Sequence, residues 1–364
     1  MRVLIAPDRV PVIAPDRAPV TSPDRVPGAL SAAETAAAVA AGWAQAAPGD
    51  VTDRLPLSDG GPGFLDVLVD ALGGDMSMVT VRGPFGEPVP ARVLVLGDTA
   101  YVEAAEAIGL HLVRHRAPDP LAASSAGVAD LLLAGQSTGC ARVVVGVGGS
   151  ATSDGGRGLV EALRGPAAGR ATLTGTEVVA ATATDAALMG PSGVAHGFAA
   201  GKGADRDTRE VIEDRLRAWA TETDGGLAVR PGAGAGGGVG FALLLLGATR
   251  VNGTELVTEA VDLEGRAAAA DLVVTAVGDL DWEMLRGRIP VGVSRAAQRA
   301  GRPTVVLAGQ VQVGRRELSA NGIDAAYAWA NEADQANGSG EADDGATAEA
   351  VARAAHRVAR TWSH

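Results

Sequence analysis

The chain has 364 residues, a formal net charge of −12 and a hydrophobic fraction of 47%. This charge argues against a general nucleic-acid or anionic-membrane surface, and no apolar run reaches the length of a membrane span. The single cysteine, Cys140, excludes an internal disulfide framework. Because the first residues are also too short an apolar run for a signal peptide, we expect a cytoplasmic protein.

The chain opens with a predicted strand at 2–6, which runs into three near-copies of an eight-residue unit at 5–12, 13–20 and 21–28. Each copy carries two prolines, which disfavour both a regular helix and a central strand. We therefore expect the repeats between Ile5 and Val20 to loop out at the surface. Capping-box spacing at Ser31 and Glu34 then predicts a helix that continues to about Ala46.

Further along, short apolar runs alternate with helical patterns and glycine-rich turns, which is typical of an α/β protein. An asparagine-, glycine- and aspartate-rich stretch at 332–346 is expected to be a flexible loop. The predicted strands cover residues 51–57, 76–82, 91–96, 142–147, 177–182, 270–278, 303–308 and 323–329.

The most informative stretch follows the predicted strand at 142–147 and covers residues 148–156, where glycines and hydroxyls surround one carboxylate, Asp154. A helix pattern begins directly after it. Glycines let backbone N–H groups approach a ligand, and a helix start favours negative charge, so this turn predicts a phosphate site. Its residues with an expected binding role are Gly148, Gly149, Ser150, Thr152 and Ser153. The alternative interpretation is a tight strand–helix turn without a ligand.

Lys202 is the only lysine in a chain that otherwise uses arginine. Its compact ammonium is therefore a candidate phosphate contact. Two further acidic residues follow predicted strands: Asp59 comes after the strand at 51–57, and Asp281 comes after the strand at 270–278. In an open parallel sheet such strand ends lie along one crevice, so we expect Asp59, Asp154 and Asp281 to converge with Lys202. Carboxylates, glycine turns and one ammonium are what phosphoryl transfer requires.

The motifs resemble those of the bacterial glycerate kinases, in the same order and spacing over nearly the whole chain. The most specific match is Gly-Gly-Ser-Ala-Thr-Ser-Asp-Gly-Gly at 148–156. The other matching segments are 6–8, 57–61, 83–89, 106–110, 231–240 and 271–293.

The resemblance implies a Rossmann-like three-layer domain with a mostly parallel sheet, plus a second α/β domain, both discontinuous in sequence. The first is expected to comprise residues 1–60, 120–160 and 265–364. The second is expected to comprise residues 61–119 and 161–264.

The resemblance also implies ATP-dependent phosphorylation of glycerate, giving 2-phosphoglycerate, with ATP and Mg²⁺ as cofactors. Asp154 and Asp281 would hold Mg²⁺ or act as a base, and Asp59 would join them in catalysis. Arg288 would bind the substrate carboxylate. Lys202 would bind ATP phosphates together with the glycine-rich turns, which include Gly234 and Gly236. No nucleic-acid or membrane partner is expected, and the oligomeric state stays open.

Several family residues are replaced, and these departures leave alternatives open. The family's Ser-Phe-Lys-Gly has become Arg-Val-Pro-Gly at 25–28, and an acid has become Pro62. Gly-Glu-Gly-x-x-Asp has become Ala-Val-Gly-Asp-Leu-Asp at 276–281. A second hypothesis is therefore a catalytically weak or inactive relative that binds a ligand or partner. A third is a nicotinamide-dependent enzyme, because Gly146, Gly148 and Ala151 loosely fit a dinucleotide fingerprint.

Overall fold

The computed structural model describes residues 1–10, 30–114, 116–329 and 348–363. The chain forms two compact units. The first combines two separate stretches, Met1–Ser58 and Val257–His364, and the second is the continuous stretch Asp59–Leu256. No helix within the described ranges is both long and apolar enough to cross a membrane.

The first unit contains a five-stranded sheet with the order β11-β10-β9-β1-β2, and all its strand pairs are parallel. The strands are β1 (Arg2–Ile5), β2 (Val51–Arg54), β9 (Leu272–Leu280), β10 (Thr304–Val311) and β11 (Ala325–Ala328). The helices are α1 (Ala32–Ala46), α11 (Leu263–Ala268), α12 (Ile289–Arg299), α13 (Arg315–Ala320) and α15 (Ala348–Trp362). A further helix, α10 (Gly253–Ala260), spans the boundary between the units.

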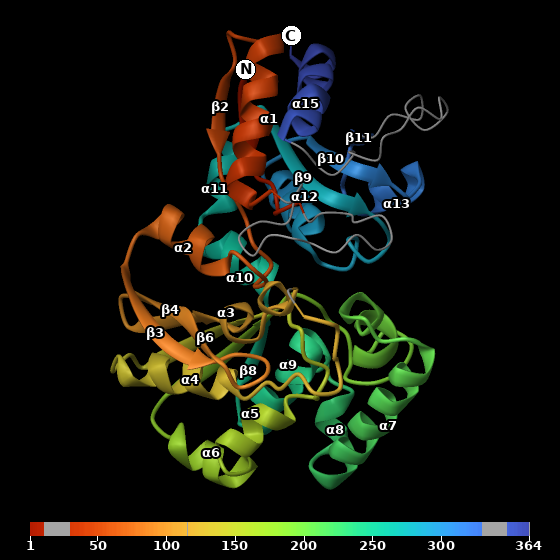
Figure 1. The fold of residues 1–364 in the computed structure, drawn as a ribbon. Coiled ribbons are helices and arrows are strands. Elements are labelled where there is room, and N and C mark those ends of the chain that lie inside the picture. Colours follow the sequence, from red (N-terminus) through yellow and green to blue (C-terminus); the bar gives the residue numbers. More distant parts are fainter. Residues whose placement is uncertain (11–29, 115, 330–347, 364) are drawn as a thin grey trace. The chain divides into compact units, whose positions relative to one another are not determined.

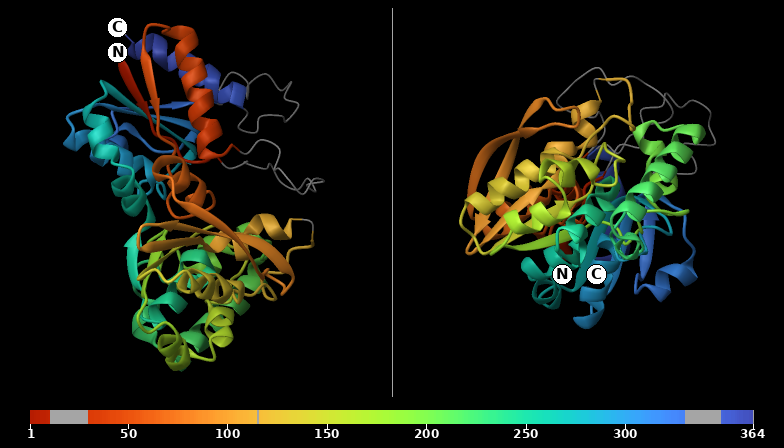
Figure 2. Two further views of the ribbon diagram at one scale, coloured as in Figure 1. Left: turned by 90° about the vertical axis from the view of Figure 1, so that its left-hand side faces the viewer. Right: turned by 90° about the horizontal axis from the view of Figure 1, so that it is seen from below.

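Helices cover both faces of this sheet, because alternate strand residues point to opposite sides. Val305 and Leu307 of β10 pack with α1 and α15, whereas Val306 and Ala308 pack on the α13 side. Helices α1 (orange-red) and α15 (blue) lie against each other on the first face (Figures 1 and 2). The predicted three-layer, mostly parallel α/β arrangement is therefore confirmed.

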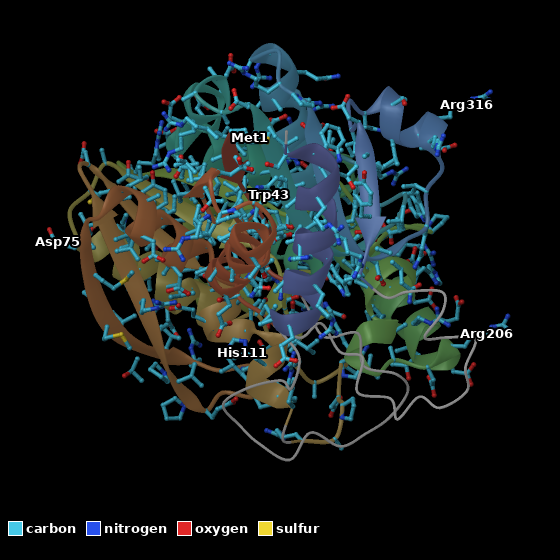
Figure 3. The ribbon with its side chains drawn as sticks, turned by 90° about the horizontal axis from the view of Figure 1, so that it is seen from above. Met1, Trp43, Asp75, His111, Arg206 and Arg316 are labelled. Carbon is cyan, nitrogen blue, oxygen red and sulfur yellow. The ribbon has the colours of Figure 1, made fainter. Side chains whose placement is uncertain are left out.

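Local sequence explains how α1 is placed. Ser31 and Glu34 form the predicted capping box, with the Ser31 hydroxyl accepting from the Glu34 N–H at 3.1 Å. Near the other end of α1, Trp43 is fully buried in the core and its indole N–H donates to Asp50 at 2.9 Å (Figure 3). These two contacts hold both ends of the helix.

Residues 5–10 of the first repeat are part of this fold, contrary to our expectation of a surface excursion from Ile5 onward. Ala6 and Val10 are fully buried. The Ala6 N–H donates to the Val274 carbonyl at 2.8 Å, and Val10 pairs with Leu30 in an isolated antiparallel bridge. Pro7, which has no backbone N–H, lies between these contacts at a position where no donor is needed. The end of the first copy at 11–12, the later copies at 13–28 and the expected loop at 332–346 lie outside the described residues.

The second unit contains a six-stranded mixed sheet with the order β3-β4-β5-β6-β7-β8. The pairs β3–β4 and β4–β5 are antiparallel, and the pairs from β5 to β8 are parallel. The strands are β3 (Asp75–Arg82), β4 (Pro88–Leu96), β5 (Thr99–Glu103), β6 (Arg142–Val147), β7 (Glu177–Thr182) and β8 (Thr249–Asn252).

Helices of several lengths surround this second sheet. Those that enter the argument below are α2 (Phe64–Leu72), α3 (Ala104–Ile108), α4 (Gly127–Ser137), α5 (Arg157–Ala162), α7 (Arg206–Glu222) and α9 (Ala235–Leu245). The remaining ones are α6 (Pro166–Thr172), α8 (Gly225–Ala228) and the short turns η1 (Leu110–Val113), η2 (Val194–Phe198) and η3 (Ala200–Lys202).

The structure differs from the expected domain boundaries at residues 120–160. We expected this segment in the first domain, but β6 pairs along its length with β5 and β7 and so belongs to the second unit. The second unit is consequently continuous in sequence. Apolar strands that end in glycines look alike in both sheets, so the sequence pattern does not reveal which sheet a strand joins.

Candidate functional site

Three glycine-rich or acidic loops meet at the carboxyl ends of the parallel strands in the second unit. The 148–156 turn follows β6 directly. The loop at 59–62 packs onto it, because a Cβ built at Gly148 would lie 2.7 Å from the Gly61 Cα and one built at Gly149 would collide with Pro62. Only glycine permits such close approach of two backbones. The sequence-based expectation that Asp59 and the 148–156 turn occur at one sheet edge fits this arrangement.

The 148–156 turn is fixed by hydrogen bonds to its neighbours. The Ala151 N–H donates to the Ile108 carbonyl at 2.7 Å, and the Thr152 hydroxyl donates to the Ala123 carbonyl at 3.0 Å. Ser150, Thr152 and Ser153 are all buried. The Ser153 hydroxyl has no hydrogen-bond partner among the described residues. The turn is therefore a rigid, polar structure rather than a solvated loop.

Asp154 caps this turn, whereas we expected its carboxylate to serve catalysis or a metal rather than a cap. Its Oδ2 accepts from the Ser125 N–H and hydroxyl, both at 2.8 Å, and from the Gly158 N–H at 3.1 Å. Its Oδ1 accepts from the Gly156 N–H at 2.9 Å. Four donors occupy most of the acceptor capacity of one carboxylate. This geometry gives Asp154 a positioning role, and a catalytic role stays a prediction.

Lys202, at the end of η3, reaches the same turn. Its ammonium donates to the Thr152 carbonyl at 2.5 Å and to the Ser150 hydroxyl at 3.2 Å. Burial lowers the pKa of Lys202 from 10.5 to about 8, because desolvation disfavours the charged form, while the nearby Asp154 carboxylate partly opposes the shift. The structure thus brings together Lys202 and two polar groups of the predicted phosphate turn, one hydroxyl and one carbonyl.

The glycine segment at 232–240 packs beneath this ammonium. Gly236, Gly237 and Gly238 all have positive φ angles, which other residues rarely adopt. A Cβ at Gly237 would collide with the Thr152 carbonyl and lie 3.1 Å from the Lys202 Nζ. At Gly234 and Gly236, which we expected to bind nucleotide, an added Cβ would meet the Ala187 carbonyl and the Val147 side chain. Close packing therefore explains these two glycines without a ligand.

One buried carboxylate, Asp59, belongs to the loop at 59–62, and a second, Glu103, contacts the residues that follow this loop. Asp59 is 7% exposed, and its Oδ1 accepts from the Gly61 N–H at 3.0 Å. Glu103, at the end of β5, accepts from the Gly63 and Leu65 N–H groups at 3.1 and 3.3 Å. Burial raises the pKa of Glu103 to about 8, and the Glu106 carboxylate adds to the shift. We did not assign Glu103 to the site; its position at the end of an apolar strand was the available signal.

In the first unit, Asp281 follows β9 and accepts from the Glu283 and Met284 N–H groups at 2.9 and 3.0 Å. The Arg288 guanidinium, expected to bind substrate, pairs with Glu283 at 2.6 Å. Asp279, which we did not assign, has a buried Oδ1 without a hydrogen-bond partner among the described residues. Burial raises the pKa of Asp279, and the negative charge of Asp281 contributes. These carboxylates belong to the other unit from Asp154 and Lys202.

Comparison with known proteins gives consistent results. The model of the glycerate kinase family matches residues 20–169 and 166–363. An uncharacterised protein of Mycobacterium bovis is 41% identical over 339 residues, covering 91% of this chain and 84% of the relative. The glycerate kinase of Bacillus subtilis is 35% identical over 329 residues, covering 82% and 86%.

One further curated relative and one solved structure also point to the glycerate kinase family. The glycerate 2-kinase of Escherichia coli is 32% identical over 333 residues, covering 82% of this chain and 86% of the relative. The crystal structure described as "putative glycerate kinase 2" from Salmonella typhimurium LT2 is 31% identical, with a TM-score of 0.68 and coverage of 99% and 98%. With two α/β units, the signature turn intact and matches along nearly its whole length, this chain belongs to the glycerate kinase family.

Proposed function

We propose that the protein phosphorylates glycerate with ATP and releases 2-phosphoglycerate and ADP. The observation that carries this proposal is the contact of Lys202 with the 148–156 turn, because it presents an ammonium and buried hydroxyls at one sheet edge. The family relationship supplies the reaction class. The choice of the 2-hydroxyl is supported by the similarity to the glycerate 2-kinase of Escherichia coli.

In this reaction the glycerate 2-hydroxyl oxygen attacks the γ-phosphorus, and the bond between that phosphorus and the bridging β–γ oxygen breaks. ADP leaves, and the hydroxyl proton passes to a base. We assign the base role to Asp59, a buried carboxylate next to the 148–156 turn. Lys202 supplies positive charge toward the phosphates, which matters because the whole chain carries −12.

Of the two carboxylates expected to bind Mg²⁺, Asp281 is suited to this role and Asp154 is not. The Asp154 carboxylate already accepts four hydrogen bonds and is a poor ligand. Asp281 and the neighbouring Asp279, with its unpartnered buried oxygen, fit better, since Mg²⁺ in such enzymes needs only one or two carboxylates besides the nucleotide. When bound, Mg²⁺ would neutralise developing charge on the phosphates.

A catalytically weak or inactive binding protein is the second candidate. It is favoured by the ion pair of Arg288 with Glu283, because this pair occupies the guanidinium expected to hold the substrate carboxylate. The two candidates differ in turnover but not in nucleotide binding.

A coupled ADP-release assay with D-glycerate and Mg²⁺-ATP tests the proposal, and ³¹P NMR of the product identifies the phosphorylated hydroxyl. We expect ADP release that depends on glycerate and a 2-phosphoglycerate signal. Binding of a non-hydrolysable ATP analogue without turnover would instead establish the second candidate. A 3-phosphoglycerate product would correct the position of transfer.

A further inference from the structure

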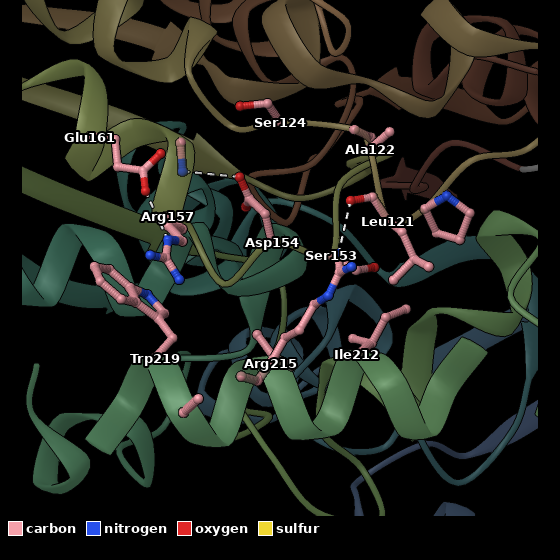
Figure 4. A pocket seen from close by; sticks show the side chains of 15 residues that line it. Leu121, Ala122, Ser124, Ser153, Asp154, Arg157, Glu161, Ile212, Arg215 and Trp219 are labelled. Atoms are coloured by element: carbon pink, nitrogen blue, oxygen red, sulfur yellow. Dashed lines mark hydrogen bonds and ion pairs between the residues drawn. The ribbon is translucent and has the colours of Figure 1, made fainter. Parts of the chain in front are cut away.

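Glu103 is a buried acid that the reaction proposed above does not use. It is 3% exposed, ends β5 and belongs to the same unit as Asp59 and the 148–156 turn. Asp154 lies on the side of that turn that lines a cavity against α7 (Figure 4), and neither Glu103 nor Asp59 lines this cavity. The contacts of Glu103 lead instead to the loop at 59–62 and the helix that follows it.

That helix, α2, begins without a side-chain cap of its own. Its N-cap residue is Gly63, with a φ of 91°, and glycine has no side chain that could accept a hydrogen bond from the first turn. Glu103 supplies the acceptors from another strand, because its Oε1 accepts from the Gly63 N–H at 3.1 Å and its Oε2 from the Leu65 N–H at 3.3 Å. The first N–H groups of a helix have no partner within it, so these acceptors fix where α2 starts.

The start of α2 in turn places the loop that carries Asp59, which lies shortly before Gly63 in the chain. Phe64, the first residue of α2, is fully buried, and a Cβ built at Gly146 of β6 would lie 2.6 Å from its ring. Packing against glycine sets how closely the backbones approach. The two hydrogen bonds from Glu103 set the position of the loop along the sheet edge, because hydrogen bonds are directional.

A second acidic link reaches the same turn of α2, but it is exposed. Asp66 pairs with the Arg92 guanidinium at 2.5 Å, and its side chain is 57% exposed. Arg92 also pairs with Glu106 at 2.5 Å, whereas no ion pair reaches Glu103 within the described part of the chain. Exposed ion pairs contribute little, because water screens them and long side chains lose freedom in forming them. The buried hydrogen bonds of Glu103 are therefore the stronger restraint on the start of α2.

Resting on the kinase function proposed above, we propose that Glu103 is a positioning residue for phosphoryl transfer. It acts through Asp59, the carboxylate to which we assign the hydroxyl proton of glycerate, and itself touches neither substrate. A general base works only within hydrogen-bond reach of the proton it takes, so a small shift of its loop removes much of its effect. Glu103 holds that loop against the 148–156 turn and thereby sets the rate of the chemical step rather than the affinity for substrates.

Steady-state kinetics of the full-length protein with D-glycerate and Mg²⁺-ATP test this role through a double-mutant cycle. Glu103→Met keeps the side-chain length and removes both acceptor oxygens, so kcat should fall about tenfold or more while both KM values stay within about twofold. Glu103→Gln retains one acceptor oxygen and should recover most of the wild-type kcat. In an Asp59→Asn protein, which is slow itself, Glu103→Met should lower kcat no further, because the group that it positions is already gone.

Asp66→Asn is the matched control, because it removes an exposed acid from the same turn of α2, and its kcat should equal that of the wild type. Glu103→Asp, which keeps the acid and shortens it by one methylene, replaces Glu103→Met in the cycle if the latter does not fold. An equal fall in kcat in the Asp59→Asn background would overturn the positioning role. A rise in KM at unchanged kcat, or no recovery in Glu103→Gln, would overturn it as well.

Amide hydrogen exchange tests the contact of Glu103 with α2 independently of turnover. The Gly63 and Leu65 amides should exchange faster in Glu103→Met than in the wild type, and Asp66→Asn should leave them unchanged. If the wild type turns over and Glu103→Met keeps its kcat, the positioning role fails and the kinase function stands. If the wild type does not turn over, the kinase function fails. Faster exchange then still supports Glu103 as the residue that holds the loop, and unchanged exchange refutes it.

Discussion

The ammonium of Lys202 lies 2.5 Å from the main-chain carbonyl oxygen of Thr152, inside the signature turn of the family. The residue is 50 positions away along the chain, so this contact links η3 to the end of β6. Because burial lowers the pKa of Lys202 to about 8, the charge of the group that makes this contact changes in the mildly alkaline range.

The first prediction concerns Lys202. Its pKa in the folded protein, about 8, lies below its ordinary value of 10.5. Between these values the unfolded chain retains a proton that the folded chain has lost, so the free energy of unfolding should rise with pH from about 8 to 10.5. Lys202→Met should lack this rise. Urea unfolding of both proteins from pH 7 to 10.5 measures the difference, and parallel profiles would contradict it.

The second prediction concerns Asp154. Asp154→Asn places an amide NH₂ among donors and should lower the free energy of unfolding by about 2 kcal/mol. Equilibrium urea unfolding at pH 7 measures the loss. Asp214→Asn, at an exposed position of α7, is the matched control and should stay within about 0.5 kcal/mol of the wild type. A fully stable Asp154→Asn protein without turnover would restore the catalytic assignment.

The third prediction concerns Glu103, whose pKa in the folded protein is about 8 against an ordinary 4.5. The folded state therefore keeps a proton that the unfolded state releases. Stability from this group is full below pH 4.5 and is lost as the pH rises toward 8. Glu103→Gln should flatten the fall in unfolding free energy over this range. Glu161→Gln, on the exposed α5 surface, serves as control and should keep the wild-type profile.

The fourth prediction concerns the repeats. Val10 and Leu30 are paired, so removing residues 11–26 joins Val10 to Pro27 and leaves three residues between the partners, a common hairpin length. The melting temperature should stay close to that of the wild type. Val10→Asp buries a charge and should cost about 3 kcal/mol or more. A large loss of stability on deletion, measured by circular dichroism, would contradict the prediction.

A deletion of residues 6–21 is a weaker test of the same question. It brings Ser22-Pro23-Asp24-Arg25-Val26 directly after Ile5, in place of Ala-Pro-Asp-Arg-Val. The replacement is nearly identical, so a stable product would not show that the first copy lies outside the core.

Local patterns in the sequence predict local structure well. The Ser31–Glu34 capping box marks the start of α1, and the apolar run with its glycine turn marks β6 and the end of that strand. Long-range partners are not visible in this way. The Asp154 carboxylate accepts a hydrogen bond from the Ser125 hydroxyl, 29 positions earlier in the chain. Strand β6 pairs with β5 in the second sheet, and the residues of β6 alone do not specify that partner.

Glu103 and Asp279 show the same limit for the site. Each is one acid among many in a chain with 43 acidic residues. What distinguishes Glu103 is its complete burial against the start of α2, and what distinguishes Asp279 is an oxygen without a partner. Both properties arise from packing and appear only in three dimensions.

A protein with a single lysine allows chemical labelling of one defined side-chain amine. Lys202 carries the only side-chain primary amine of the chain, and the α-amino group of Met1, which pairs with Asp50 at 2.7 Å, is the other primary amine. Its pKa of about 8 leaves a substantial neutral, nucleophilic fraction under mildly alkaline conditions. An amine-reactive reagent would then label Lys202 beside the Thr152 carbonyl and, separately, the Met1 amine. The rate of labelling at Lys202, followed by mass spectrometry of its peptide, would read out occupancy of the turn.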